Sequence, residues 1–201
     1  MAQKNVVVVG FTDPSKAYQA LSVLKECDAD GRIAVDSAAV VERTAEGALR
    51  IPESADNVGL AGTASGSLIG MLVGVLGGPV GLLLGWGAGA MIGGAFDVDR
   101  AVTSDEALTV LGQAIPPEST ALIASVEEPA VEVIDGEMAK LGGEVTRRPV
   151  AQVMDELEAA EDAADAAAHA ARKAVREKRK AELSSRVEER VGKLKEKLHV
   201  G

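Results

Sequence analysis

Few residues of this chain have a type and a spacing that could carry out chemistry. The two histidines, His169 and His199, have no cysteine or histidine beside them at the spacing of a metal site. The single cysteine, Cys27, has no histidine in the predicted globular part to activate it, which favours a structural thiol over a nucleophile. Residues 28–31 begin like a calcium loop, but Ala39 stands where a bidentate glutamate is needed. We therefore predict no catalytic, cofactor-binding or metal-binding residue, and no enzyme activity.

An uncharged stretch, residues 59–96, stands out because it holds no Lys, Arg, Asp, Glu or His. Within it, glycine recurs at every fourth position in two runs, and Pro79 between them predicts a helical hairpin. Because each glycine weakens a helix by roughly 0.5–1 kcal/mol relative to alanine, we expect a compensating close approach of helices, a glycine zipper. The glycines predicted to carry this oligomerisation are Gly62, Gly66, Gly70, Gly74, Gly81, Gly85, Gly89 and Gly93.

Strand and helix patterns surround this stretch in the order βαβ, then βαβ. Before it, the sequence predicts a strand at residues 5–11, a helix from Asp13-Pro14 to about Asp28, a strand at 33–43 and a short partner at 48–52. After it come a helix capped by Ser104 and ended by Pro116, a strand at 120–126, a helix from Pro129 to Leu141 and a strand at 144–150. We expect an α+β fold: a ferredoxin-like split βαβ domain with an inserted hairpin. One face of its sheet is expected to be open and to be buried by dimerisation.

The C-terminal part predicts one long helix, because residues 151–199 contain no proline and Gly192 is their only glycine. Such a helix is about 70 Å long. Its end shows coiled-coil spacing over about two heptads. Its basic run could contact an anionic surface, or could pair with the acidic residues of a neighbouring tail. The run consists of Arg172, Lys173, Arg176, Lys178, Arg179 and Lys180. The predicted divisions are therefore residues 1–58 and 97–150 for the two halves of the α+β domain, 59–96 for the hairpin and 151–201 for the charged, alanine-rich tail.

Composition narrows the classes of partner. The net charge of −10 and the four aromatic residues make nucleic acid an unlikely partner, and no small-molecule substrate is evident. One cysteine fits a reducing cytoplasm. The N-terminal segment lacks the apolar core of a signal peptide, so we expect a protein that faces the cytoplasm.

Four segments together resemble a bacterial family of domains of unknown function. They are AAVVER, GSLIGMLVGVLGGPVGLLLGWGAGAMIGGAF, IPPESTALIASVEE and LGGEVTRR, and the resemblance covers roughly residues 4–150. Members are described as predicted membrane proteins or general-stress-like proteins with a glycine-zipper insertion. The resemblance implies membrane association and a use under stress, and it supplies no established reaction.

Three hypotheses for function stay open at this point. The first is a non-enzymatic homo-oligomer that associates with the inner face of the cell membrane through the hairpin, whose arms of about 17 residues are at the short end for a span. The second is a soluble structural scaffold that forms a large particle or filament, with the C-terminal helix as a docking arm. In the third, the hairpin only folds onto its own domain.

Overall fold

The structure, a computed structural model, describes residues 3–52, 58, 67–78 and 106–199, and for 181–182 and 184–199 only the helix backbone. The chain divides into two compact units, Met1–Ala160 and Glu161–Gly201. The first ten residues of the predicted tail thus belong to the first unit. The first unit is an α+β domain, and the described part of the second is the continuation of one helix.

The described strands form one five-stranded antiparallel sheet with the order β3-β2-β4-β1-β5. The strands are β1 (Gln3–Phe11), β2 (Ala34–Arg43), β3 (Leu49–Arg50), β4 (Thr120–Glu128) and β5 (Glu144–Pro149). The helices in the described residues are α1 (Pro14–Ala29), α2 (Leu68–Gly77), α4 (Ala107–Gln113), α5 (Val131–Lys140) and α6 (Val150–His199). The predicted α+β class and the long C-terminal helix are confirmed.

The inner strand β1, which pairs with β4 and β5, is buried on both faces, as its run of four valines predicts. Val6 to Val9 are all fully buried, and successive side chains of a strand point to opposite faces. Val6 and Val8 belong to one apolar core, whereas Val7 and Val9 belong to the other. The sheet therefore separates two cores, and each needs its own helical cover.

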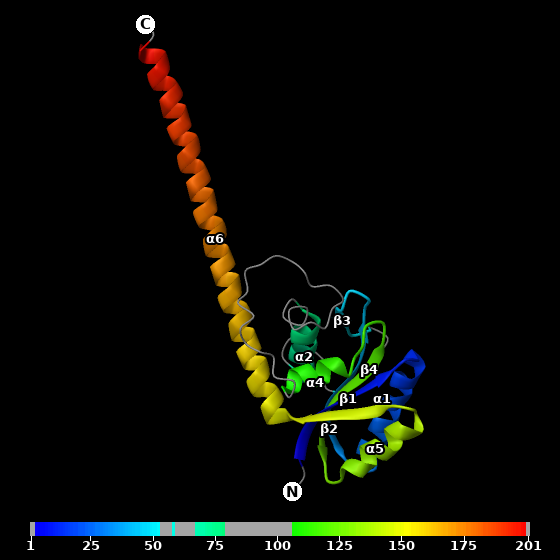
Figure 1. Cartoon of the computed structure of the whole chain (residues 1–201). Helices are drawn as coiled ribbons and strands as arrows, with labels where there is room; N and C mark the ends of the chain where they lie inside the picture. Colours follow the sequence, from blue (N-terminus) through cyan, green and yellow to red (C-terminus); the bar gives the residue numbers. More distant parts are fainter. Residues whose placement is uncertain (1–2, 53–57, 59–66, 79–105, 200–201) are drawn as a thin grey trace. The chain divides into compact units, whose positions relative to one another are not determined.

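Helices α1 and α5 cover one face of the sheet (Figure 1). Leu21 and Leu24 of α1 and Ile134 and Met138 of α5 are buried there against the strands. The predicted start of α1 is confirmed, since Asp13 is its N-cap and its carboxylate accepts a hydrogen bond from Ser15 N at 2.9 Å.

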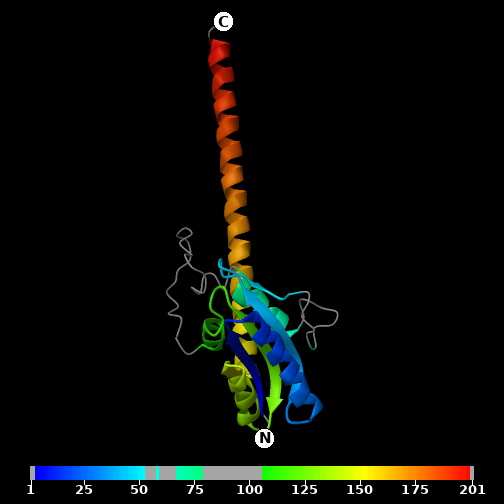
Figure 2. The ribbon, with the colours of Figure 1, turned by 90° about the vertical axis from the view of Figure 1, so that its right-hand side faces the viewer.

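The other face of the sheet is not open, which corrects the sequence-based expectation. Helices α2 and α4 and the first turns of α6 lie on this face (Figures 1 and 2). Their apolar side chains are buried against it. Four leucines on these helices are at most 1% exposed: Leu72 and Leu76 of α2, Leu111 of α4 and Leu157 of α6. The expectation failed because it treated residues 68–77 as part of an insertion and residues after 150 as a tail. Both segments belong to the core of the domain.

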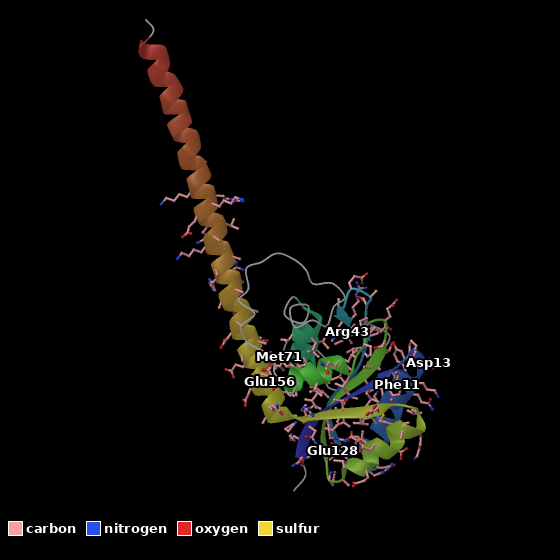
Figure 3. All side chains as sticks on the ribbon, viewed as in Figure 1. Phe11, Asp13, Arg43, Met71, Glu128 and Glu156 are labelled. Carbon is pink, nitrogen blue, oxygen red and sulfur yellow. The ribbon has the colours of Figure 1, made fainter. Side chains whose placement is uncertain are left out.

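The start of α4 also differs from the prediction, in which Ser104 caps the helix. Ser104 lies outside the described residues, and the N-cap position of α4 is Glu106, which makes no side-chain capping bond. The cap comes from α6, because the Glu156 carboxylate accepts hydrogen bonds from Ala107 N and Leu108 N, each at 2.8 Å (Figure 3). A negative charge at this end also complements the helix dipole. Glu156 therefore fastens the first turns of α6 to α4.

Candidate assembly interface

Two of the eight predicted zipper glycines, Gly70 and Gly74, lie in the described part of the chain, on helix α2. The Ser67 hydroxyl caps this helix by accepting a hydrogen bond from Gly70 N at 3.1 Å. Gly74 is exposed, and a Cβ built on it would meet no described atom within 4 Å. Among the described residues, nothing therefore packs closely on this glycine. The other six predicted glycines, Gly62, Gly66, Gly81, Gly85, Gly89 and Gly93, lie outside them.

A close backbone approach does occur on α2, but at Gly77, which the four-residue spacing does not include. A Cβ on Gly77 would lie 2.6 Å from Leu49 N and 2.8 Å from Leu49 Cβ. These distances are shorter than ordinary van der Waals contact, so the side-chain-free residue lets the end of α2 pack directly on strand β3.

The apolar side of α2 faces its own domain. Ile69, Leu72, Val75 and Leu76 are buried among strand residues of the same chain, and Met71 packs on this cluster as a half-buried side chain (Figure 3). Burial of each large aliphatic side chain contributes about 1.5–3 kcal/mol. Residues 68–77 thus use their apolar surface in folding, as the third sequence-based hypothesis expects of the hairpin. The described residues contain no helix that is both long and apolar enough to cross a membrane.

The predicted basic run lies on α6, and all six of its side chains are exposed. Helical spacing brings Arg172, Arg176 and Arg179 to one side of the helix, and Lys173 and Lys180 to the neighbouring side. Every residue from 168 to 180 is exposed, including Val175 at 54%. The side chains of this whole segment are therefore accessible on all sides of the helix.

Cys27 is buried at the end of α1, and its Sγ accepts a hydrogen bond from Arg32 Nη1 at 3.5 Å. Burial raises the pKa of the Cys27 thiol and outweighs the opposing effect of the Arg32 charge. The thiol form is thus favoured over the thiolate. The part of the chain that the structure describes holds no cluster of three potential metal ligands.

A cavity of about 250 Å³ opens at the end of β1. Gly10, Phe11 and Thr12 line it together with Ser119 and Thr146. Among the described residues of its lining, Glu144 is the ionisable one. The described lining residues thus do not form an acid–base or nucleophile–base pair.

Sequence reasoning missed a buried ionic network at the other end of β1. Glu128, labelled in Figure 3, has a fully buried side chain. Its carboxylate accepts hydrogen bonds from Asn5 Nδ2 and Arg147 Nε, each at 3.0 Å. Arg147 also donates to Asp135 at 2.7 Å. Burial disfavours the charged guanidinium, but the Asp135 and Glu128 carboxylates outweigh this effect and raise the pKa of Arg147. These contacts depend on strand register, which no local sequence pattern indicates.

Together these observations define a class of protein: an α+β domain with a five-stranded antiparallel sheet, extended by a long helix whose later turns are exposed. Residues 63–162 match the family model described as "Protein of unknown function (DUF1269)". The match starts later than the predicted resemblance and extends into α6, which fits the finding that the first turns of α6 belong to the domain. No curated protein and no solved structure matches the chain.

Proposed function

We propose that this protein is a non-enzymatic homo-oligomer that acts as a structural scaffold in the cytoplasm. In this proposal the α+β domain is a ferredoxin-like domain, and residues 161–199 of α6 are the docking arm. The order β2-β4-β1-β5, with α1 and α5 on one face, supports the ferredoxin-like assignment. The remaining strand, β3, is an addition at the edge of the sheet.

The observation that carries this proposal is the complete exposure of residues 168–180 on a helix of 50 residues. A helix gains most of its stability from packing of one face, and alanine-rich helices are marginal in water without it. The docking arm therefore gains stability when it binds another helix. The arm carries both acidic and basic segments, so two copies of it can pair opposite charges. We therefore propose a second copy of the same chain as its partner.

The burial of α2 supports a scaffold over the membrane-associated oligomer. An arm of a membrane hairpin needs apolar side chains on its outside, but Ile69, Leu72 and Leu76 already contribute to the core of the domain. The scaffold proposal uses residues 68–77 for folding and the docking arm for association.

Flotation with lipid vesicles tests this proposal. The full chain is mixed with vesicles of phosphatidylcholine and phosphatidylglycerol, washed with high salt and centrifuged in a density gradient. We expect the protein to stay in the dense fractions as uniform lipid-free particles in negative-stain images. Flotation with the vesicles after the salt wash would overturn the scaffold proposal in favour of a membrane element.

A further inference from the structure

The exposed part of α6 carries a charge pattern that repeats every seven residues. Glu158, Asp165, Arg172 and Arg179 follow one another at this spacing, which keeps them on one side of the helix, and all four are exposed. The sign of the charge changes once, between Asp165 and Arg172. The series is therefore acidic in its first half and basic in its second half.

An apolar line of small residues runs beside this charged series. Ala164, Ala168, Ala171 and Val175 follow the 4-3-4 spacing of a coiled-coil seam. Ala168, Ala171 and Val175 are exposed, and Ala164 is half-buried. Helix axes approach to about 8–10 Å depending on the side chains at the contact, so alanines allow the close end of this range.

We infer that two copies of the chain pair through this seam with their α6 helices antiparallel. The inference rests on the proposed function and specifies its interface. Reversing one helix exchanges the two halves of the charged series. Asp165 of each copy then lies beside the seam within two residues of Arg172 of the other copy, about 3 Å along the axis. The same alignment places Ala164 opposite Val175 and Ala168 opposite Ala171. The twofold axis then passes midway between Ala168 and Ala171.

The ends of the seam agree with this alignment. Continuing the spacing in both directions leads to Glu161 and Lys178, which are both exposed. In the antiparallel pair they lie opposite each other, so an acid again meets a base at each end of the apolar contact. In a parallel pair in the same register, Asp165 and Arg172 lie across from Ala160 and Ala167 of the other copy, so neither charge gains an opposite charge.

Cysteine cross-linking tests the orientation directly in the full chain. In a Cys27→Ala background, the variants Ala164→Cys and Val175→Cys are oxidised separately and as a mixture. Positions 164 of two antiparallel copies lie about 16 Å apart, given a rise of 1.5 Å per residue. A disulfide requires a Cα separation of about 4.4–6.8 Å. We therefore expect an interchain disulfide in the mixture, and none in either variant alone.

Charge exchange tests the pairing without cysteine. The symmetric pair contains two contacts between residues 165 and 172. Asp165→Arg makes both contacts Arg–Arg, and Arg172→Asp makes both Asp–Asp. We expect each substitution to weaken association about tenfold. The double variant, Asp165→Arg with Arg172→Asp, restores opposite charges and is expected to return association to the wild-type level. Lys173→Asp changes a charge beside the series and serves as the matched control, with a smaller effect.

The outcomes distinguish a failure of the antiparallel α6 interface from a failure of the scaffold function. A disulfide in either single-cysteine variant, or no recovery in the charge-exchanged double variant, overturns the antiparallel pair while the chain still associates. A wild-type chain that sediments as a monomer at every concentration overturns the scaffold function, and with it this interface.

Discussion

Replacing Arg147 with methionine is expected to lower the free energy of unfolding by about 3 kcal/mol, because it leaves a buried carboxylate without its cation. The Glu128 side chain is fully buried, and Arg147 donates to both of its oxygens, at 3.0 and 3.4 Å. After the substitution, Asn5 is the partner that still donates to Glu128, through Nδ2. Urea denaturation at neutral pH, followed by far-ultraviolet circular dichroism, measures the change.

The matched control is Lys4→Met, which removes a cation from an exposed pair. Lys4 Nζ lies 3.1 Å from Asp36 Oδ2, with side-chain exposures of 55% and 48%. Solvent-exposed pairs contribute about 0–1 kcal/mol, so this variant should unfold close to the wild-type urea concentration. Equal effects of the two substitutions would contradict the assignment of Arg147 as the cation of a buried network.

Two glycine-to-alanine substitutions on α2 are expected to change stability in opposite directions. Gly74→Ala should raise the free energy of unfolding by about 0.5–1 kcal/mol, because alanine is the better helix former and its Cβ meets no described atom. Gly77→Ala should lower it by about 1–3 kcal/mol, because the new Cβ overlaps the backbone of Leu49 and forces α2 away from β3. The same denaturation experiment measures both.

This pair also distinguishes a folded helix from an intermolecular zipper. If Gly74 lines a close helix–helix contact between copies, its Cβ has no room, and Gly74→Ala should weaken association and stability together. A stabilised Gly74→Ala variant with unchanged native mass would agree with α2 as a component of the domain. A destabilised variant that loses native mass would instead support the glycine zipper.

Local patterns in the sequence predicted most of the elements. Four consecutive valines predict the buried strand β1, and Asp13 before Pro14 predicts the start of α1, because both signals act within a few residues. The long C-terminal helix followed from the absence of proline. The predicted bounds lie within a few residues of those in the structure.

The sequence did not indicate which surface each apolar helix face packs against. Residues 68–77 are uncharged on every side, so their pattern does not indicate whether they bury against a sheet, another copy or lipid. Val153 and Leu157 did carry a signal, since their i, i+4 spacing at the start of α6 indicates a buried face. The Glu156 cap and the Glu128–Arg147 pair join residues that are distant in sequence, and the tertiary fold alone brings them together.

Sedimentation velocity of two chains tests the central claim most directly: the full chain and a chain that ends at Ala160. The shorter chain keeps Val153, Glu156 and Leu157 and so retains the contacts of α6 with the domain. We predict that the full chain associates increasingly with concentration, whereas the shorter chain sediments as a monomer. A shorter chain that forms the same oligomer as the full chain would contradict the claim that α6 is the docking arm, and would place assembly in residues 1–160.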